Sequence, residues 1–186
     1  EKEKTKESAI RSAFLKGNTK EHYLLFYSDE AAANSITKNE TIKIKFEIDT
    51  MPPDYATFER EFPLTPFPYE VNLYDMPSLF AGKIHAVLCR AWHNRVKGRD
   101  LYDYVFYLSK GASVNLKHLQ WRLIQSEVLT ETDAFDIKIL RSMLCDKFDT
   151  IDYEQAKQDV KPFIRDTSQL DIWSAEFFKG ITNQLH

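Results

Sequence analysis

The densest cluster of side chains that could do chemistry spans residues 83–103. It contains five cations and two carboxylates: Lys83, Arg90, Arg95, Lys97, Arg99, Asp100 and Asp103. On an ideal helix Lys83 and Arg90 project from one face because they are nearly two turns apart, and Asp100 and Asp103 also share a face. Such groups could hold a triphosphate with a divalent metal ion, or a phosphate beside a general base. The alternative is a solvated basic surface followed by an acidic pair that complements the dipole of the next helix.

Two other groups of residues have positions that suit metal ions. Asp49 ends a strand of alternating polarity, on its polar face with Glu47, and a strand end can hold a carboxylate rigidly enough to bind a metal. His85, Cys89 and His93 are spaced by four and form a row along one helix, which could bind zinc. The alternatives are a plain exposed face for Asp49 and a simply buried cysteine for the row.

Aromatic side chains are frequent in the second half of the chain. Seven of them stand out: Tyr102, Tyr104, Phe106, Tyr107, Trp173, Phe177 and Phe178. They could form a stacking platform for RNA bases. Their helical periodicity favours core packing instead.

The elements that must position these residues divide into an early part rich in strands and a late helical part. Periodicity predicts the end of a helix over 8–16, stopped at Gly17, and then strands over 22–27, 42–49, 58–62 and 69–74. It predicts helices over 79–91, 99–109, 115–125, 132–147, 151–160 and 171–181. Thr132 and Thr150 are the predicted N-caps of the 132–147 and 151–160 helices. This order predicts an α+β fold, with a sheet region over 1–76 and a helical C-terminal domain over 77–186.

Composition excludes several classes of protein. The chain has 186 residues, is 43% hydrophobic and carries 25 Lys and Arg against 28 Asp and Glu, which excludes a disordered chain. Because the net charge is -3, overall electrostatic attraction does not draw the chain to nucleic acid or to a membrane. No apolar run is long enough to span a bilayer. Two cysteines without Cys-x-x-Cys spacing are typical of a reducing compartment, so we expect a cytoplasmic protein.

Three runs of the sequence resemble the AbiEii/AbiGii toxin family, the nucleotidyltransferase-like toxins of bacterial toxin–antitoxin and phage-abortive systems. They are IKIKFEIDTMPP at 42–53, SLFAGKIHA at 78–86 and RVKGRDLYD at 95–103. The likeness is close over 42–108 and fainter toward the C-terminus, at 159–163 and 173–174. It implies a nucleotidyltransferase sheet like that of DNA polymerase β, a helical C-terminal part, an NTP substrate and Mg²⁺.

The resemblance also implies roles for individual residues. Asp49 matches a strand-borne acidic position that binds metal, and Lys83 matches the motif lysine that meets nucleotide phosphates. Arg99, Asp100 and Asp103 match an Arg-Asp-x-x-Asp element in which one aspartate is a base or a metal partner. Lys83, Asp100 and Asp103 are therefore the expected catalytic residues, and Arg99, with Arg90 of the same basic cluster, is expected to bind the nucleotide. Two metal ions would stabilise the attacking and leaving oxygens of phosphoryl transfer.

The family's first motifs, a Gly-Gly-Thr-Ala-Leu-like helix start and a Ser-x-Asp-x-Asp strand with the first two metal ligands, have no match in this sequence. We therefore expect the chain, which begins at Glu1 rather than Met, to be the C-terminal portion of a longer toxin and inactive alone. The parent would transfer a nucleotide to an acceptor such as tRNA or another RNA. The alternatives are a non-catalytic module that binds the cognate antitoxin, or one that binds RNA through the basic cluster.

Overall fold

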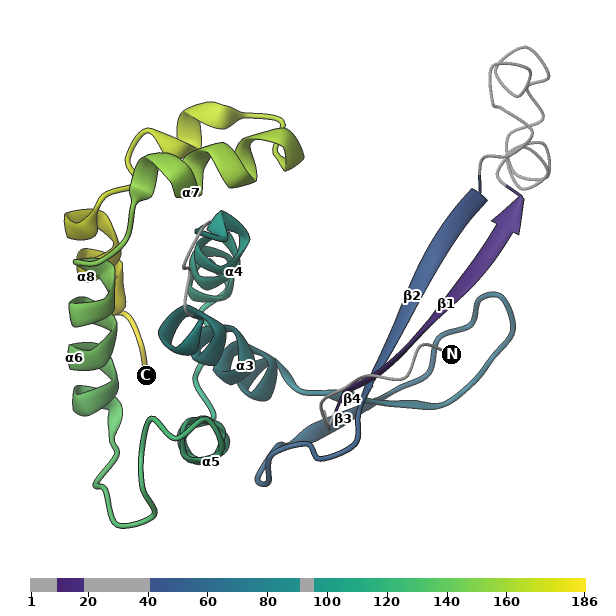
Figure 1. Ribbon diagram of the computed structural model, residues 1–186. Coiled ribbons are helices and arrows are strands. Elements are labelled where there is room, and N and C mark those ends of the chain that lie inside the picture. The colour runs from purple at the N-terminus through teal and green to yellow at the C-terminus, as the bar shows by residue number, and fades with distance from the viewer. Residues whose placement is uncertain (1–9, 19–40, 91–95) are drawn as a thin grey trace, which may run out of the picture. The chain divides into compact units, whose positions relative to one another are not determined.

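The computed structural model describes residues 10–18, 41–90 and 96–186 (Figure 1). The chain divides into two compact units, Glu1–Pro52 and Pro53–His186. The predicted boundary between 76 and 77 lies within the second unit. Among the described residues, no helix is both long and apolar enough to cross a bilayer.

The first unit contains an antiparallel hairpin of β1 (Ile10–Asn18) and β2 (Thr41–Asp49). The alternation over 42–49 correctly predicts β2. The predicted helix over 8–16 is wrong, because 10–18 is a strand whose backbone pairs along its whole length with β2, from Ile10 opposite Asp49 to Asn18 opposite Thr41. A few apolar residues at helical spacing are a weak signal, and pairing with a neighbouring strand outweighs it. The strand predicted over 22–27 lies outside the described residues.

The second unit begins with a short antiparallel hairpin, β3 (Phe58–Glu61) and β4 (Val71–Tyr74), which confirms the strands predicted at 58–62 and 69–74. Phe58 stacks on Tyr74 with 4.8 Å between ring centres. The residue after β4, Asp75, is the N-cap of the first described helix, and its carboxylate accepts a hydrogen bond from the Ser78 N–H at 3.0 Å. The hairpin therefore leads directly into the helices.

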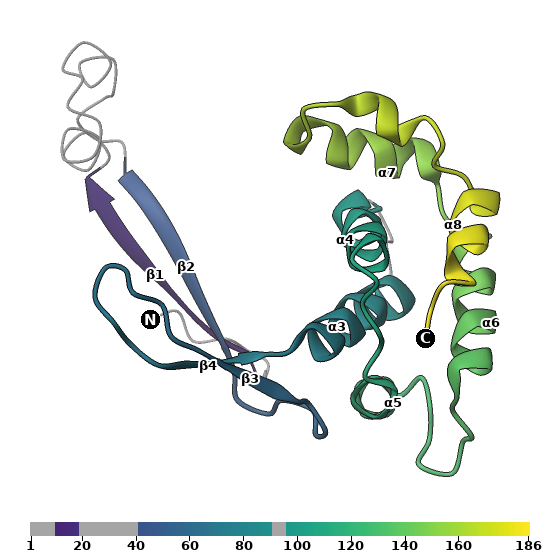
Figure 2. The same ribbon diagram turned by 180° about the vertical axis from the view of Figure 1, so that it is seen from behind.

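All six predicted helices are present, with shifted ends. They are α3 (Met76–Cys89), α4 (Gly98–Ser109), α5 (Leu116–Gln125), α6 (Ile137–Phe148), α7 (Tyr153–Val160) and α8 (Ala175–Thr182). Two short 3₁₀ helices, η1 (Lys161–Phe163) and η2 (Thr167–Leu170), follow α7. Figures 1 and 2 show α6 and α8 side by side, and α3 between α4 and α5. The α+β class is confirmed.

The predicted N-caps Thr132 and Thr150 are wrong. Both residues lie in turns, and the helices begin later, with Asp136 as the N-cap of α6 and Asp152 as the N-cap of α7. In each case the aspartate carboxylate accepts hydrogen bonds from N–H groups of the first helical turn. A carboxylate also interacts favourably with the positive end of the helix dipole, which explains why aspartate and not threonine takes these positions.

The core of the second unit is a cluster of aromatic rings. Tyr104 of α4 is fully buried and lies 5.8 Å from Phe80 of α3, 5.5 Å from Phe148 of α6 and 6.5 Å from Phe178 of α8, measured between ring centres. Its hydroxyl is within 2.8 Å of the Thr182 hydroxyl. One side chain of α4 therefore contacts three other helices.

We predict that Gly98→Ala destabilises the protein by about 2–3 kcal/mol, because overpacked sites cost this much. A Cβ at Gly98 would lie 2.0 Å from the carbonyl oxygen of Ala156 in α7, and backbone cannot move aside easily. Gly180→Ala in α8 is the matched control. No atom lies within 4 Å of its Cβ position, and alanine in a helix is favoured by about 0.5–1 kcal/mol. Urea unfolding followed by circular dichroism measures both, and equal effects would contradict the packing described here.

Candidate functional site

Two ion pairs join α3 to α4. The Lys83 Nζ is 2.8 Å from Asp103 Oδ2, and the Arg90 Nη1 is 2.7 and 2.8 Å from the two carboxylate oxygens of Asp100. Helical spacing predicts only that Lys83 and Arg90 share one face and Asp100 and Asp103 another; the structure pairs Lys83 of α3 and Arg90, the C-cap residue of α3, with the two carboxylates of α4. Each cation is matched to one carboxylate, so the cluster is electrically balanced at its centre.

Packing between the two helices explains how these charges meet. α3 buries Phe80, Ile84 and Val87, and α4 buries Leu101 and Tyr104. Residues beside the buried positions lie at the margin of the contact, where long cationic side chains on one helix can reach carboxylates on the other. The apolar faces therefore set the positions of the ion pairs.

The two carboxylates differ in burial. The Asp100 side chain is 8% exposed, whereas that of Asp103 is 34% exposed. Asp100 is also in the first turn of α4, where the helix dipole favours a negative charge. Its partner Arg90 uses a single nitrogen, Nη1, for both bonds, so its other N–H groups can donate to a ligand. Asp100 is therefore nearly buried and held through both oxygens, whereas Asp103 is more accessible and has one bond.

The other predicted cations lie apart from these pairs. Arg99 is exposed, and its guanidinium carbon is 6.0 Å from the ring centre of Phe163 in η1. Lys97 is the exposed N-cap residue of α4 and makes no side-chain cap bond. Arg95 lies outside the described residues. The nucleotide-binding role of Arg99 stays a prediction.

Asp49 is the last residue of β2, in the first unit. Its side chain is exposed, and its Oδ1 accepts a hydrogen bond from the Met51 N–H at 3.0 Å. In the part of the chain that the structure describes, no three His, Cys, Asp or Glu side chains gather as they would to hold a metal ion. The two α4 carboxylates are each bonded to a cation. Metal binding by Asp49 therefore stays a prediction.

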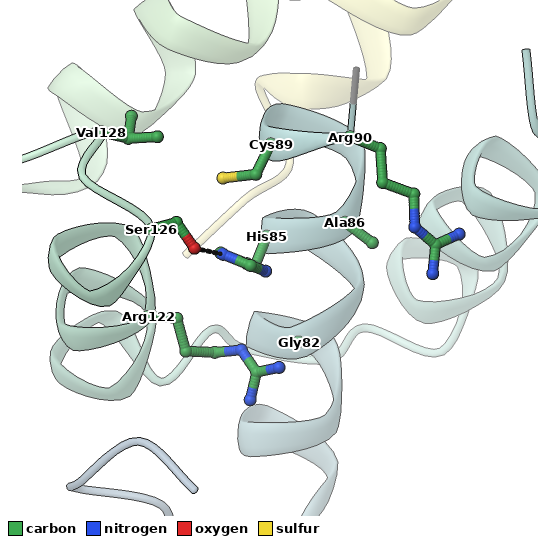
Figure 3. Close-up of a pocket in the computed structure, with 8 residues that line it drawn as sticks. All are labelled: Gly82, His85, Ala86, Cys89, Arg90, Arg122, Ser126 and Val128. Atoms are coloured by element: carbon green, nitrogen blue, oxygen red, sulfur yellow. Dashed lines mark hydrogen bonds between the residues drawn. The ribbon is translucent and has the colours of Figure 1, made fainter. Parts of the chain in front are cut away.

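The structure describes two of the three residues of the predicted zinc row, His85 and Cys89, and both line a cavity. His93 lies outside the described residues. His85 and Cys89 line a cavity of about 420 Å³ between α3 and the end of α5 (Figure 3), with Gly82, Ala86, Arg90, Arg122, Ser126 and Val128. Burial raises the pKa of the Cys89 thiol, which is the opposite of an activated nucleophile.

His85 is a neutral side chain in this cavity. Its Nε2 is 2.7 Å from the Ser126 hydroxyl. Burial, followed by the positive charges of Arg122 and Arg90, lowers its pKa from 6.5 to about 4. Arg122 was not a candidate in the sequence, because an isolated arginine on a predicted helix carries no signal until the partner helix is known.

The aromatic residues divide between core and surface. Tyr104, Tyr107, Trp173 and Phe178 are buried, and Phe177 packs partly buried against them. For these residues core packing is confirmed. Tyr102 and Phe106 of α4 are exposed, at 36% and 43%. The Lys110 ammonium is 5.6 Å from the Phe106 ring centre, so α4 carries aromatic rings next to cations on its outer face.

In a comparison with known protein families, residues 1–178 match the family described as nucleotidyl transferase AbiEii toxin, type IV toxin–antitoxin system. No curated protein and no solved structure matches the chain. The matched range contains all residues of both ion pairs. It also extends well beyond 42–108, where the sequence resemblance is closest.

We predict that the Arg90–Asp100 pair stabilises the fold more than the Lys83–Asp103 pair. Double-mutant cycles with Arg90→Gln and Asp100→Asn should give a coupling energy of about 1–2 kcal/mol, because one partner is desolvated and doubly bonded. Cycles with Lys83→Met and Asp103→Asn should give less than about 1 kcal/mol, as is usual for half-exposed pairs. Urea unfolding measures both. A larger coupling for the Lys83 pair would contradict this prediction.

We also predict that His85 makes the protein acid-sensitive. Because its folded pKa of about 4 lies below its ordinary value of 6.5, protonation favours the unfolded chain. The contribution of His85 is therefore fully present above pH 6.5 and is lost as the pH falls toward about 4. His85→Gln keeps a polar group near Ser126 and does not titrate. The free energy of unfolding of the wild type and of His85→Gln is measured from pH 6.5 to about 4. As the pH falls, the wild type should lose stability relative to the variant. A constant difference between the two would contradict the prediction.

Proposed function

The chain belongs to the AbiEii family of nucleotidyl transferase toxins of type IV toxin–antitoxin systems, and from this membership we propose that its α3–α4 ion pairs form part of a nucleotide-transfer site. The substrate is an NTP, and the acceptor is an RNA such as tRNA. The observation that carries the proposal is the juxtaposition of Lys83 and Arg90 with two carboxylates in a chain of this family.

In this proposal the phosphates of the NTP bind to the two cations of α3. Lys83 is 41% exposed in its side chain, and a triphosphate can replace Asp103 as its partner. Asp103 is then free to accept a proton from an acceptor hydroxyl, which is the role of a general base. Asp100 stays bonded to Arg90 and keeps its guanidinium in position, so it is a positioning residue.

The acceptor surface in this proposal is the outer face of α4 with η1. Arg99 lies over Phe163, which is 70% exposed, and Lys110 lies over Phe106. Unpaired RNA bases stack on exposed aromatic rings while neighbouring cations contact the phosphates. These four residues lie on the same helix as the ion-paired carboxylates, or packed against it.

The proposal includes no step through a metal ion. Mg²⁺ is implied by the family resemblance, but the described carboxylates are bonded to Lys83 and Arg90 and do not gather as a metal site. We therefore propose that this chain by itself binds nucleotide without transferring it.

A second candidate function is binding of the cognate antitoxin without catalysis. It is favoured by the apolar side chains that the β3–β4 hairpin and its connection leave exposed, Phe58, Phe62, Leu64 and Phe67, each at least 60% exposed. Exposed apolar patches of this kind mark interaction surfaces. Substitution of Lys83 and Asp100 by alanine separates the two functions, because antitoxin binding survives these changes and nucleotide binding does not.

We predict that Lys83→Met lowers the affinity of the chain for an NTP by about tenfold, the effect of losing one charged hydrogen bond. Lys157→Met is the matched control, since Lys157 also pairs with a carboxylate at 2.8 Å, on Glu154, but lies on α7. Isothermal titration calorimetry with each NTP measures the affinity, and incubation of labelled NTP with tRNA measures transfer.

Equal affinities of the Lys83 variant and the wild type would overturn the nucleotide-binding role. Labelled tRNA formed by the chain alone would overturn the proposed inactivity and leave the binding role intact. A loss of affinity in the Lys157 variant as well would indicate a general charge effect.

A further inference from the structure

Arg122 is a cation without a carboxylate partner in the part of the chain that the structure describes. It lies on α5, facing α3, and its Nε is buried with no hydrogen-bond acceptor. Arginine stays protonated at all ordinary pH values, so this charge is not removed by a pKa shift. The residue as a whole is half-buried, so part of its charge is removed from water without a carboxylate, and an anion would offset that cost.

A buried histidine holds Arg122 in place. The Nδ1 of His118 is 2.8 Å from the Asp54 carbonyl oxygen, which can only accept a proton, so Nδ1 carries the hydrogen. The Nε2 then accepts from Arg122 Nη1 at 3.4 Å. Burial lowers the pKa of His118 and keeps it in this neutral form. The contact uses one guanidinium nitrogen and leaves Nη2 for a ligand.

The cavity beside Arg122 has the size and lining of an anion site. Its volume of about 420 Å³ lies in the range of small-molecule sites, and none of its lining residues is acidic. Gly82 has no side chain, and the Arg122 guanidinium carbon lies 3.8 Å from where its Cβ would be. Figure 3 shows Arg122, His85 and Ser126 around the space between the helices, while the Arg90 guanidinium points to the other side of α3.

We propose that this cavity binds a phosphate group, with the Arg122 guanidinium as the principal donor and the Ser126 hydroxyl as a neutral neighbour. The ligand is a small phosphate anion, either free phosphate or the phosphate of a nucleotide. Burial is the main cause that lowers the pKa of His85, and the charges of Arg122 and Arg90 lower it further, which agrees with a positive potential in the cavity. The cavity shares the lining residue Arg90 with the α3–α4 pairs, but the Arg90 guanidinium points away from it (Figure 3), and neither Lys83 nor Asp103 lines it, so the proposal does not depend on the function proposed above.

The test is a titration of the chain with inorganic phosphate at constant ionic strength, followed through the NMR signal of the Arg122 Nε–H group. We expect a saturable shift. Arg122→Gln should weaken binding by about tenfold, measured by calorimetry, because a charged donor is lost. Lys117→Gln is the matched control on the same helix, where the ammonium lies over the Tyr55 ring at 3.9 Å, and it should bind phosphate as the wild type does.

The outcomes separate this site from the α3–α4 site. Unchanged phosphate binding by Lys83→Met supports the proposal, and loss of binding in that variant overturns it by assigning the anion to α3–α4. Absence of a saturable shift in the wild type also overturns it, as does an equal loss in the Lys117 variant. If Arg122→Gln does not fold, Arg122→Lys keeps the charge and loses the planar fork, and it should still weaken binding.

A second titration, with ATP, identifies the source of the phosphate. Tighter binding of ATP than of inorganic phosphate, sensitive to Arg122→Gln, supports the site as one for nucleotides. Equal affinity for the two ligands, with the same sensitivity, supports a site for free phosphate. If Arg122→Gln changes the affinity for neither ATP nor inorganic phosphate, the proposal is overturned.

Discussion

The helical unit depends on the burial of Tyr104. Its ring contacts aromatic side chains of three other helices, and its hydroxyl is paired with Thr182, so the polar atom of this buried side chain is satisfied. Burial raises the pKa of Tyr104 well above its ordinary value, so it stays protonated and can keep this hydrogen bond. A side chain held from several sides has one orientation, and it therefore fixes the rotation of α4 about its axis. Asp103 precedes Tyr104 directly and Asp100 is one turn away, so this rotation turns both carboxylates toward α3.

Two carboxylates three residues apart thus acquire different properties from one packing arrangement. Asp100 is nearly buried and bonded through both oxygens, and Asp103 is one-third exposed with a single bond. A buried charge with its partner holds geometry, because breaking the pair leaves an unmatched charge. A half-exposed pair is weak and can be exchanged for a ligand. This difference agrees with an Arg-Asp-x-x-Asp element in which Asp100 holds Arg90 in position and Asp103 contacts the substrate.

Much of the fold was predictable because it follows from local periodicity. Alternation over 42–49 predicts β2, and apolar residues at helical spacing predict six helices within a few residues. The failures have two causes. The segment 10–18 forms a strand through its pairing with β2, an interaction between segments distant in the chain. The N-caps of α6 and α7 depend on which of several polar residues meets the free N–H groups, and near Thr132 and Thr150 aspartates offer the stronger acceptor.

The sequence by itself determined which residues share a helix face, Lys83 with Arg90 and Asp100 with Asp103, and three of its runs resembled the family. Helix geometry repeats every few residues, so such facts are local. Only the tertiary structure decided that the cations and carboxylates pair, that one acid is buried, and that Arg122 lies beside His85 without a carboxylate partner among the described residues. These facts depend on how α4 and α5 pack against α3, and packing joins residues far apart in the chain, such as His85 and Ser126 at 41 positions. No spacing along the chain contains that information.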